Sequence, residues 1–292
     1  MKRIVAATDL SAWSHYALER AAQLARARSA ELDVVHVPSH GRWPQGEGIL
    51  DRYIAGLGQR SLEDDRAQLE RETAGLSRRF KVKPRCHVLP GRAAEEIAAF
   101  ASSREVDLVV LGTRGHGRLR PQAVGGTALK VVWQSLLPVL LVRHPADDVY
   151  RRMLIATDLG ERAGHVARTA LEWFPRASTS LLHAFRGEHE TTLQLLGATT
   201  EAQRRYVVDT GTEAATAFEA FADGLEGEGK RKVERLLAHG HPMPAILKAA
   251  TEVDADLVVL GKHAGAQWEE RVLGSVVQNL LQQLKTDILL VP

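Results

Sequence analysis

The stretch that decides the fold is Asp107-Leu-Val-Val-Leu-Gly-Thr-Arg-Gly-His-Gly117, followed closely by Gly125-Gly126-Thr127. Its apolar run, Leu108 to Leu111, is too short for a helix and rich in valine, which is typical of a strand covered on both faces. The run stops at Gly112, a loop with two more glycines follows, and the next helix is expected from about Thr127. A strand, a glycine-rich loop and a helix start together present backbone N–H groups and a helix dipole to an anion. The stretch therefore predicts a phosphate-binding loop.

Glycine suits such a loop because it accepts a positive φ and has no Cβ to hold a ligand away from the backbone. Positive side chains follow in and beside the loop, at Arg114, His116, Arg118 and Arg120. A single glycine would indicate nothing, because many strand-to-helix connections contain one. Glycines at the strand end, in the loop and at the helix start are stronger evidence, and they make a phosphate site roughly as probable as a purely structural turn.

The overall composition narrows the class of protein. With 292 residues, the chain is longer than one ordinary domain, so two domains are expected. Hydrophobic residues make up 45% and charged residues 25%, which is typical of a globular protein with a sizeable core. The net charge of +2 gives no indication of nucleic-acid binding. The single cysteine, Cys86, favours a reducing compartment, and neither a signal peptide nor an apolar membrane span is evident. We therefore expect a cytoplasmic protein with no nucleic-acid or membrane partner.

The sequence contains two similar halves in tandem. Ala7-Thr-Asp-Leu10 recurs as Ala156-Thr-Asp-Leu159, and Asp107 to Gly112 recurs letter for letter as Asp256 to Gly261, both at an offset of 149. The same offset relates Gly125 to Gly274. A constant offset across separate segments indicates a tandem duplication. We place the boundary in the polar stretch around residues 144–148, which gives domains 1–146 and 147–292.

Each half is predicted to alternate strands with helices, which indicates an α/β fold with a parallel, doubly wound sheet. In the first half a long helix is expected over about Ile49–Phe80. In the second half, Glu188 to Gly229 is predicted as two helical pieces, broken at Gly197 and Gly211. The predicted strands are Arg3–Thr8, Leu32–Val37, Lys83–Leu89, Leu108–Leu111, Val139–Val142, Met153–Thr157, Ser180–Ala184, Lys232–Leu237, Leu257–Leu260 and Ile288–Val291. Four tryptophans are predicted to be packing residues: Trp43, Trp133, Trp173 and Trp268.

Several of these segments together resemble the universal stress protein family. They are Ala6-Ala-Thr-Asp-Leu-Ser11, His36-Val37, Leu89-Pro-Gly91, Gly112-x-x-Gly115-x(nine)-Gly125 before a helix, and Pro138-Val-Leu-Leu-Val142. The resemblance covers both halves and so is to the tandem form. It implies two tandem open five-stranded sheets in the order 3-2-1-4-5, with helices on both faces. Ligands of such sheets bind at the crevice between strands one and four, where Asp9 and Gly112 would face each other.

The family's ATP-binding members carry Gly-x-x-Gly-x(nine)-Gly-Ser/Thr, and the two halves depart from it differently. The first half has all three glycines, but Gly126 stands where the pattern has Ser or Thr, and Thr127 comes one residue late. The second half keeps Gly274-Ser275 but has Ala264 in place of the second glycine, with Glu269 and Glu270 in the loop. The resemblance therefore implies a better ATP site in the first half and a partly degenerate one in the second.

Carried over position by position, the resemblance assigns nucleotide contacts in both halves. In the first half these are Ala7, Thr8, Asp9 and Val37 at the adenosine end, Leu111 and Gly112 beneath it, and Gly115, Gly125, Gly126 and Thr127 at the phosphates. The matching positions in the second half are Ala156, Thr157, Asp158, Ala184, Leu260, Gly261, Gly274, Ser275 and Val276. Asp9 could accept a hydrogen bond from ribose or adenine, or help to hold Mg²⁺. Its alternative role is an N-cap, and Asp158-x-x-Glu161 spells a capping box.

Motifs of dedicated catalysts are missing from the sequence. It contains no Gly-x-x-x-x-Gly-Lys, no Gly-x-Gly-x-x-Gly after the first strand and no His-Glu-x-x-His. His239 and His241, with His263, could approach a metal, but surface loop histidines are the favoured interpretation, and no metal site is predicted. His36 and His183 end matching strands, which favours a shared structural hydrogen bond.

The leading hypothesis is a cytoplasmic stress-response protein that binds ATP, with AMP as the alternative nucleotide and Mg²⁺ accompanying it. Binding would regulate or stabilise the protein, which is not predicted to be a dedicated enzyme. Two alternatives stay open: an interaction scaffold with empty pockets, and a very slow ATPase. The two halves are expected to pair as an intramolecular pseudo-dimer through Val139–Val142 and Ile288–Val291, because an apolar strand edge is a liability when uncovered. A homodimer of the whole chain is left open.

Overall fold

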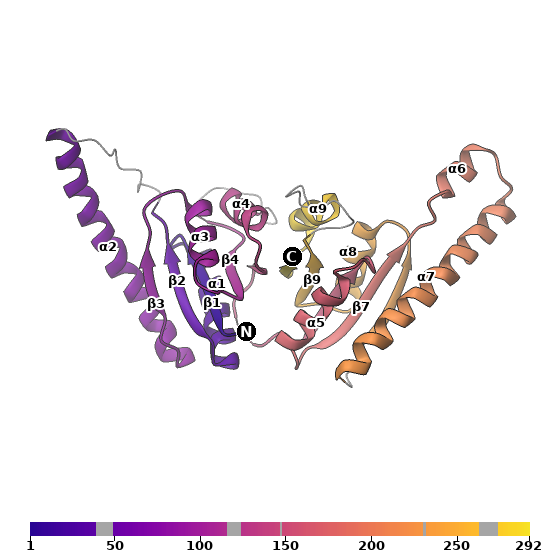
Figure 1. The fold of residues 1–292 in the computed structure, drawn as a ribbon, viewed down its shortest axis with the longest axis horizontal. Helices are drawn as coiled ribbons and strands as arrows, with labels where there is room; N and C mark the ends of the chain where they lie inside the picture. The colour runs from indigo at the N-terminus through magenta and orange to yellow at the C-terminus, as the bar shows by residue number, and fades with distance from the viewer. Residues whose placement is uncertain (39–48, 116–123, 147, 230–231, 263–273) are drawn as a thin grey trace. The chain divides into compact units, whose positions relative to one another are not determined.

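The computed structural model describes residues 1–38, 49–115, 124–146, 148–229, 232–262 and 274–292, with the backbone alone for residues 49–61 and 226–229. The chain divides into two compact units (Figure 1). The first comprises Met1–Val149 together with Lys285–Leu290 and Pro292, and the second comprises Tyr150–Leu284 and Val291. Among the helices of these described ranges, none combines the length and the apolar character that crossing a bilayer requires.

The first unit is a twisted α/β sheet whose strands run in the predicted order 3-2-1-4-5. The pairs β1–β2, β1–β4, β2–β3 and β4–β5 are all parallel. Its own strands are β1 (Arg3–Thr8), β2 (Glu31–His36), β3 (Arg85–Val88), β4 (Leu108–Gly112) and β5 (Val139–Val142). The strands β1, β4 and β5 are buried except for Arg3 and Gly112 at their ends, as their apolar runs predict. This sheet brings the carboxyl ends of β1 and β4 side by side.

Four helices connect these strands. They are α1 (Ala12–Arg28), α2 (Ile49–Phe80), α3 (Ala93–Ser102) and α4 (Gly126–Gln134). Helix α1 contacts α2 and packs on β1 and β4, whereas α3 packs against α4. Right-handed crossovers to either side of β1 place α1 and α2 on one face and α3 and α4 on the other. The predicted long helix over Ile49–Phe80 is confirmed as α2.

The second unit repeats the scheme with the sheet order β9-β6-β7-β8. Its strands are β6 (Arg152–Thr157), β7 (Ser178–Phe185), β8 (Glu234–His239) and β9 (Leu257–Gly261). Its helices are α5 (Ala163–Trp173), α6 (Glu190–Leu195), α7 (Thr200–Gly229), α8 (Pro242–Glu252) and α9 (Ser275–Gln283). The α/β class and the repeated strand order are therefore as predicted.

The last strand, β10 (Asp287–Val291), follows β9 in the strand order and is the fifth strand predicted for the second half. Residues Lys285–Leu290 group with the first unit, and β10 pairs antiparallel with β5 in the register Leu289 to Leu140. Without this pairing, the apolar strand β5 would be an open sheet edge. Asp287 reinforces the pairing, because its buried Oδ1 accepts a 2.7 Å hydrogen bond from the backbone N–H of Arg143.

The predicted break at Gly211 is wrong, because α7 continues through that residue. A Cβ at Gly211 would lie 3.1 Å from Cζ of Phe185, so the close approach of that ring accounts for the glycine. The break at Gly197 is confirmed, with φ of +70° between α6 and α7. Trp173 is buried as predicted, but Trp133 is 50% exposed and is not a packing residue. Trp43 and Trp268 lie outside the described residues.

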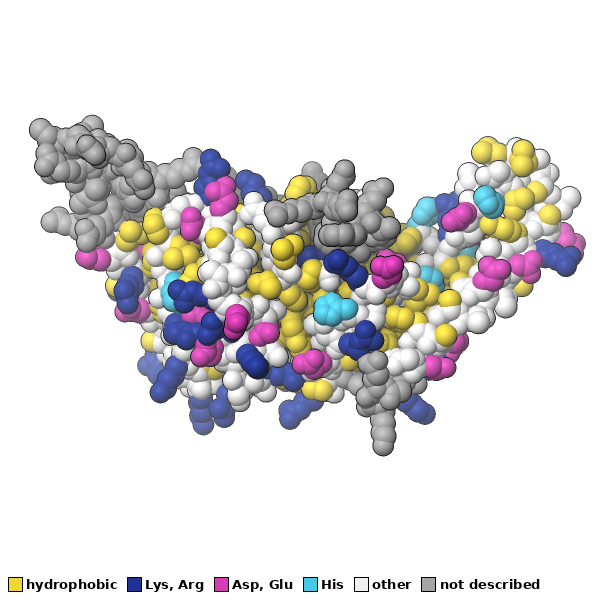
Figure 2. Space-filling model, viewed as in Figure 1, with side chains coloured by type: hydrophobic (Ala, Val, Ile, Leu, Met, Phe, Trp, Pro, Cys, Tyr) yellow, Lys and Arg dark blue, Asp and Glu magenta, His cyan; other side chains and the backbone are white. Residues whose placement is uncertain are grey.

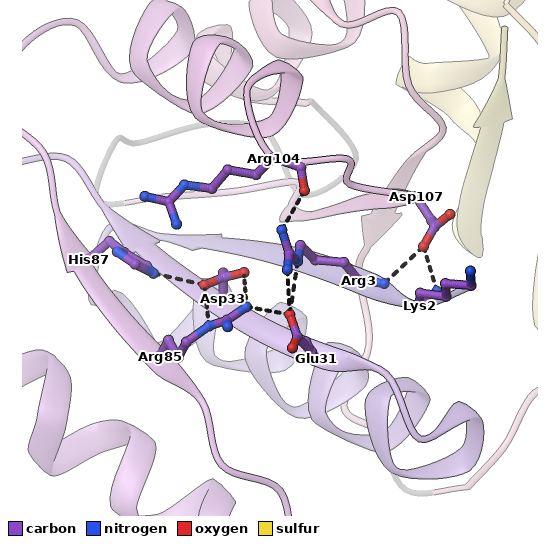
Figure 3. Close-up of polar contacts among 8 residues, drawn as sticks. All are labelled: Lys2, Arg3, Glu31, Asp33, Arg85, His87, Arg104 and Asp107. Atoms are coloured by element: carbon purple, nitrogen blue, oxygen red, sulfur yellow. Dashed lines mark hydrogen bonds and ion pairs between the residues drawn. The ribbon is translucent and has the colours of Figure 1, made fainter.

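At the amino-terminal end of the first sheet, side chains tie the edge strand β3 to β2 (Figure 3). Asp33 on β2 is fully buried and accepts hydrogen bonds from Nε and Nη2 of Arg85 at 2.9 and 3.0 Å. Nε2 of His87 lies 2.8 Å from Oδ1 of Asp33. Burial raises the pKa of Asp33, but the bonds from Arg85 and His87 outweigh it and hold that pKa below its usual value. This network stabilises the sheet at the end opposite the predicted site.

Candidate functional site

The repeated Ala-Thr-Asp-Leu segment forms the same tight turn in both halves. Leu10 and Leu159 adopt φ values of 64° and 58°, a left-handed conformation that costs a leucine about 1–2 kcal/mol. In each turn the threonine hydroxyl accepts the leucine N–H, at 2.9 Å from Thr8 and 3.0 Å from Thr157. These bonds offset the strain, which explains why the four-residue motif recurs. The turn sits where β1 or β6 ends.

The Asp9 carboxylate has one oxygen in the turn and the other near the glycine loop. Oδ1 accepts the N–H of Ser11 at 3.1 Å. A Cβ built on Gly115 would lie 2.2 Å from Oδ2, so any other residue at this position would force the carboxylate to shift. The resemblance implied that Asp9 would face Gly112; in the structure the carboxylate lies beside Gly115, and Gly112 lies close to the backbone of Trp13 and Ser14.

The N-cap alternative for these aspartates is not what the structure shows. Ser11 caps α1 by accepting the N–H of Ser14 at 3.2 Å. In the second half, α5 begins at Ala163 and Oδ1 of Asp158 accepts the N–H of Gly160 at 2.9 Å. The sequence pattern of a capping box therefore marks an Asx turn here.

The start of α4 supplies the amides expected of a phosphate cradle, with one exception. Gly125 is the N-cap residue, and its N–H donates to the backbone oxygen of Thr113 at 2.8 Å, so this amide is already engaged. The N–H groups of Gly126, Thr127 and Ala128 open the helix and have no acceptor among the described residues. Gly126 and Thr127 are exposed. Three free amides and the helix dipole can bind an anion.

A cavity of about 1100 Å³ lies at the carboxyl ends of β1 and β4, and it brings the predicted first-half residues together. Apolar strand ends with little exposure form part of its wall, at Ala7, Val37 and Leu111. Residues of α1, of α4 and of the loop after β4 form other parts of the wall. All the predicted positions line it: Ala7, Thr8, Asp9, Val37, Leu111, Gly112, Gly115, Gly125, Gly126 and Thr127. His116, Arg118 and Arg120 lie outside the described residues.

Charged side chains of both signs border the cavity. Arg114 and Lys130 contribute positive charge, and Asp9 and Asp65 contribute negative charge. The guanidinium carbon of Arg114 lies 4.3 Å from the ring centroid of Trp13, a cation–π contact at the first turn of α1. Because Trp13 is 42% exposed, this contact can be exchanged for a ligand anion at little cost.

The second-half positions occupy the same places on their own elements. Ala156 and Thr157 end β6, Ala184 lies near the end of β7, and Leu260 and Gly261 end β9. Asp158 follows β6, and Gly274, Ser275 and Val276 open α9. The loop between Lys262 and Gly274, which holds Ala264, Glu269 and Glu270, lies outside the described residues. The structure therefore does not assemble this set into one described cavity.

A polar network covers the neighbouring strand ends in the second half. Oε1 of Glu190 accepts the N–H of Gly187 at 2.7 Å and lies 2.9 Å from Nε2 of His239. Nη1 of Arg186 lies 2.7 Å from Nε2 of His241. Within the described ranges no three His, Cys, Asp or Glu side chains gather to hold a metal ion. His263 lies outside these ranges.

Sequence reasoning missed several cavity residues. His36, Asp65 and Gln68 border the cavity, as does Arg92 before α3. The expected backbone bond of the strand-end histidines is confirmed: Nδ1 of His36 lies 2.9 Å from the oxygen of Thr8, and Nδ1 of His183 lies 3.0 Å from that of Thr157. The position of both histidines at the ends of matching strands predicted this bond, but it did not show that His36 also lines the cavity.

Comparison with known proteins places both halves in one family. The model of the universal stress protein family matches residues 1–143 and again 149–292. A universal stress protein of Mycolicibacterium smegmatis is 26% identical over 306 residues, covering 99% of this chain and 96% of that protein. Universal stress protein A homolog 1 of Coxiella burnetii is 32% identical over 142 residues, covering 48% of this chain and 95% of that protein.

Solved structures agree at the level of the fold. The crystal structure of a universal stress protein from Archaeoglobus fulgidus superposes with a TM-score of 0.65 at 16% identity, covering 99% of this chain and 97% of that one. The repeated strand order, the twice-formed Ala-Thr-Asp-Leu turn and the double match to the family model agree with one another. This chain therefore belongs to the universal stress protein family, in its tandem two-domain form.

Proposed function

We propose that the first-half cavity binds an adenine nucleotide, ATP or AMP, as a regulatory or stabilising ligand of a cytoplasmic stress-response protein. The observation that carries this proposal is the convergence of the motif residues on one cavity of about 1100 Å³. That volume is sufficient for a nucleotide, since ligand cavities commonly measure roughly 300–1,000 Å³. Residues far apart in sequence line it from β1, β2, β4 and α4.

The two ends of the cavity suit the two ends of a nucleotide. The base would lie against the apolar strand ends at Ala7, Val37 and Leu111, and the phosphates would accept hydrogen bonds from the amides that open α4. Asp9 is a carboxylate directly beside the phosphate loop, so it would repel a bare triphosphate. With Mg²⁺ bound, Asp9 would supply an oxygen ligand alongside phosphate oxygens, which is how Mg²⁺ is commonly held in nucleotide sites.

Titration calorimetry of the full chain with ATP and with AMP, each with and without Mg²⁺, tests this proposal. We expect heat of binding for Mg-ATP with a stoichiometry of at least one per chain, and weaker binding when Mg²⁺ is chelated. Thr8 and Asp9 have counterparts in Thr157 and Asp158, whereas Ala264 replaces Gly115. A stoichiometry of two would therefore indicate that the second-half site is competent despite this change. Absence of binding at millimolar nucleotide would refute the proposal.

A second candidate function is an interaction scaffold, favoured by an exposed apolar patch on the second unit. Leu195, Leu196 and Val208 are 83%, 77% and 64% exposed, on and next to α6 and α7, where Figure 2 shows apolar side chains at the surface. Exposed apolar patches commonly mark protein-binding sites. A scaffold would show partner binding that is unchanged by ATP. A phosphate-release assay tests the remaining alternative, a very slow ATPase, for which the sequence provides no tuned general base.

The pairing of the two halves as an intramolecular pseudo-dimer is also part of the proposal. It is supported by the antiparallel register between β5 and β10, in which residues 288–290 lie opposite residues 139–141. Deleting the final six residues should then expose β5 and promote association between chains, which light scattering would detect.

A further inference from the structure

His36 is a buried histidine with one ring nitrogen engaged and the other available. It ends β2, is 5% exposed, and its Nδ1 lies 2.9 Å from the backbone oxygen of Thr8. A carbonyl oxygen only accepts hydrogen bonds, so Nδ1 carries the hydrogen. In the neutral imidazole, Nε2 is then a bare acceptor. Nε2 has no hydrogen-bond partner among the residues that the structure describes.

The position of this acceptor relates it to the adenosine end of the cavity. His36 lines the cavity, stands opposite Thr8 in the β1–β2 register and directly precedes Val37. Ala7 and Val37, its neighbours on that wall, are buried, and their apolar side chains offer no acceptor that would compete with Nε2 for a ligand donor. Nε2 is not among the fully buried side-chain atoms without a partner, so a ligand donor that enters the cavity can reach it and replace a hydrogen bond to water.

We propose that Nε2 of His36 accepts a hydrogen bond from the 6-amino group of the bound base, and thereby makes the site selective for adenine. This inference rests on the proposed nucleotide function. The 6-amino group is a donor that distinguishes adenine from the 6-oxo purines, which present a carbonyl oxygen there. Two acceptors facing each other repel, so a 6-oxo purine would leave His36 unsatisfied. His36 would therefore determine specificity through the base, whereas the α4 amides bind any phosphate.

The second half contains a matched histidine. His183 makes the same backbone bond from Nδ1 to Thr157, at 3.0 Å. Its ring lies 6.0 Å, centroid to centroid, from that of Phe218, a fully buried side chain of α7. In the first half, the residue that corresponds to Phe218 at the repeat offset of 149 is Leu69 on α2, whose side chain is smaller. Substitution of His183 thus removes an equivalent structural bond from the other half and controls for a purely structural effect.

Calorimetry with two triphosphates that differ only at position 6 tests the inference: ATP and purine riboside 5′-triphosphate, which lacks the amino group. With Mg²⁺ present, wild type should bind ATP at least about tenfold more tightly than the analogue. In His36→Leu the ratio should fall to near one, through weaker ATP binding with the affinity for the analogue unchanged. His183→Leu should keep the wild-type ratio.

Each contrary result has a distinct meaning. Equal binding of both triphosphates by wild type would overturn the role of the 6-amino group without requiring any variant to fold. A His36→Leu protein that weakens both ligands alike would show that the histidine acts only on the structure. A His36→Leu protein that keeps the tenfold ratio would assign the selectivity elsewhere. If wild type binds neither triphosphate, the proposed nucleotide function itself fails.

Discussion

Replacing Gly115 with alanine should weaken nucleotide binding through one side chain, that of Asp9. The new Cβ would lie 2.2 Å from Oδ2 and 3.3 Å from Cγ of Asp9. To restore a van der Waals separation, the carboxylate must move by roughly 1 Å. That movement disturbs the 3.1 Å bond from the N–H of Ser11 to Oδ1 and the oxygen proposed to hold Mg²⁺.

The expected loss follows from these two contacts. A hydrogen bond to a charged group contributes about 1.5–3 kcal/mol, and part of it is retained if the carboxylate finds a new rotamer. We therefore expect a loss of about 1.4–2.8 kcal/mol in binding, a 10- to 100-fold rise in the Kd for Mg-ATP. Titration calorimetry measures the Kd directly, and circular dichroism confirms that the variant is folded.

Gly126→Ala is the matched control, because a Cβ there meets nothing within 4 Å and the backbone amide is kept. Because Gly126 is the first residue of α4 and alanine favours the helix, Gly126→Ala should leave the Kd unchanged without destabilising the protein. If Gly115→Ala binds Mg-ATP as tightly as Gly126→Ala does, the contact between Asp9 and the loop has no part in the site. Equal weakening in both would instead mean that any added methyl group in the loop disturbs the phosphates.

Two further predictions concern buried charges. Asp33→Ala should destabilise the first unit by about 2–3 kcal/mol, because it removes the buried carboxylate that Arg85 and His87 contact. The loss is limited because the Arg85 side chain is half-exposed and stays hydrated. Hydrogen exchange should become faster in β2 and β3 and stay unchanged in peptides of the second unit. Because the pKa of Asp33 is lowered in the folded state, its contribution should be complete above the unfolded carboxyl value of about 4 and lost as the pH falls through the folded value. Burial lowers the pKa of Lys262, which is 2% exposed, to about 7. The unfolded chain then binds more protons at this residue between about pH 7 and 10, so stability should rise with pH across that window. Lys262→Met should flatten this rise; a variant whose Tm rises between pH 7 and pH 9.5 as steeply as that of wild type would contradict the reasoning.

Local sequence patterns predicted which residues line the cavity, but not the hydrogen bonds that they make there. The glycines and the Ala-Thr-Asp-Leu motif identified residues that line one cavity, because parallel strands leave their carboxyl ends at one edge of the sheet. The sequence could not show that the amide of Gly125 is engaged by Thr113, since that bond depends on how the loop closes. It could not show the available nitrogen of His36 either, because that depends on which backbone oxygen faces the ring.

The sequence by itself determined the duplication and the α/β class, because apolar runs, glycines and offsets are local or periodic signals. The strand order followed from the resemblance to the universal stress protein family. The pairing of β10 with β5 was also predicted, but only the tertiary structure decided that the two strands run antiparallel and in which register. It also decided that Gly211 continues a helix, where the Phe185 ring approaches within 3.1 Å of a Cβ position. These features depend on contacts between residues distant in sequence, and their free energies are set by shape and burial that no local pattern records.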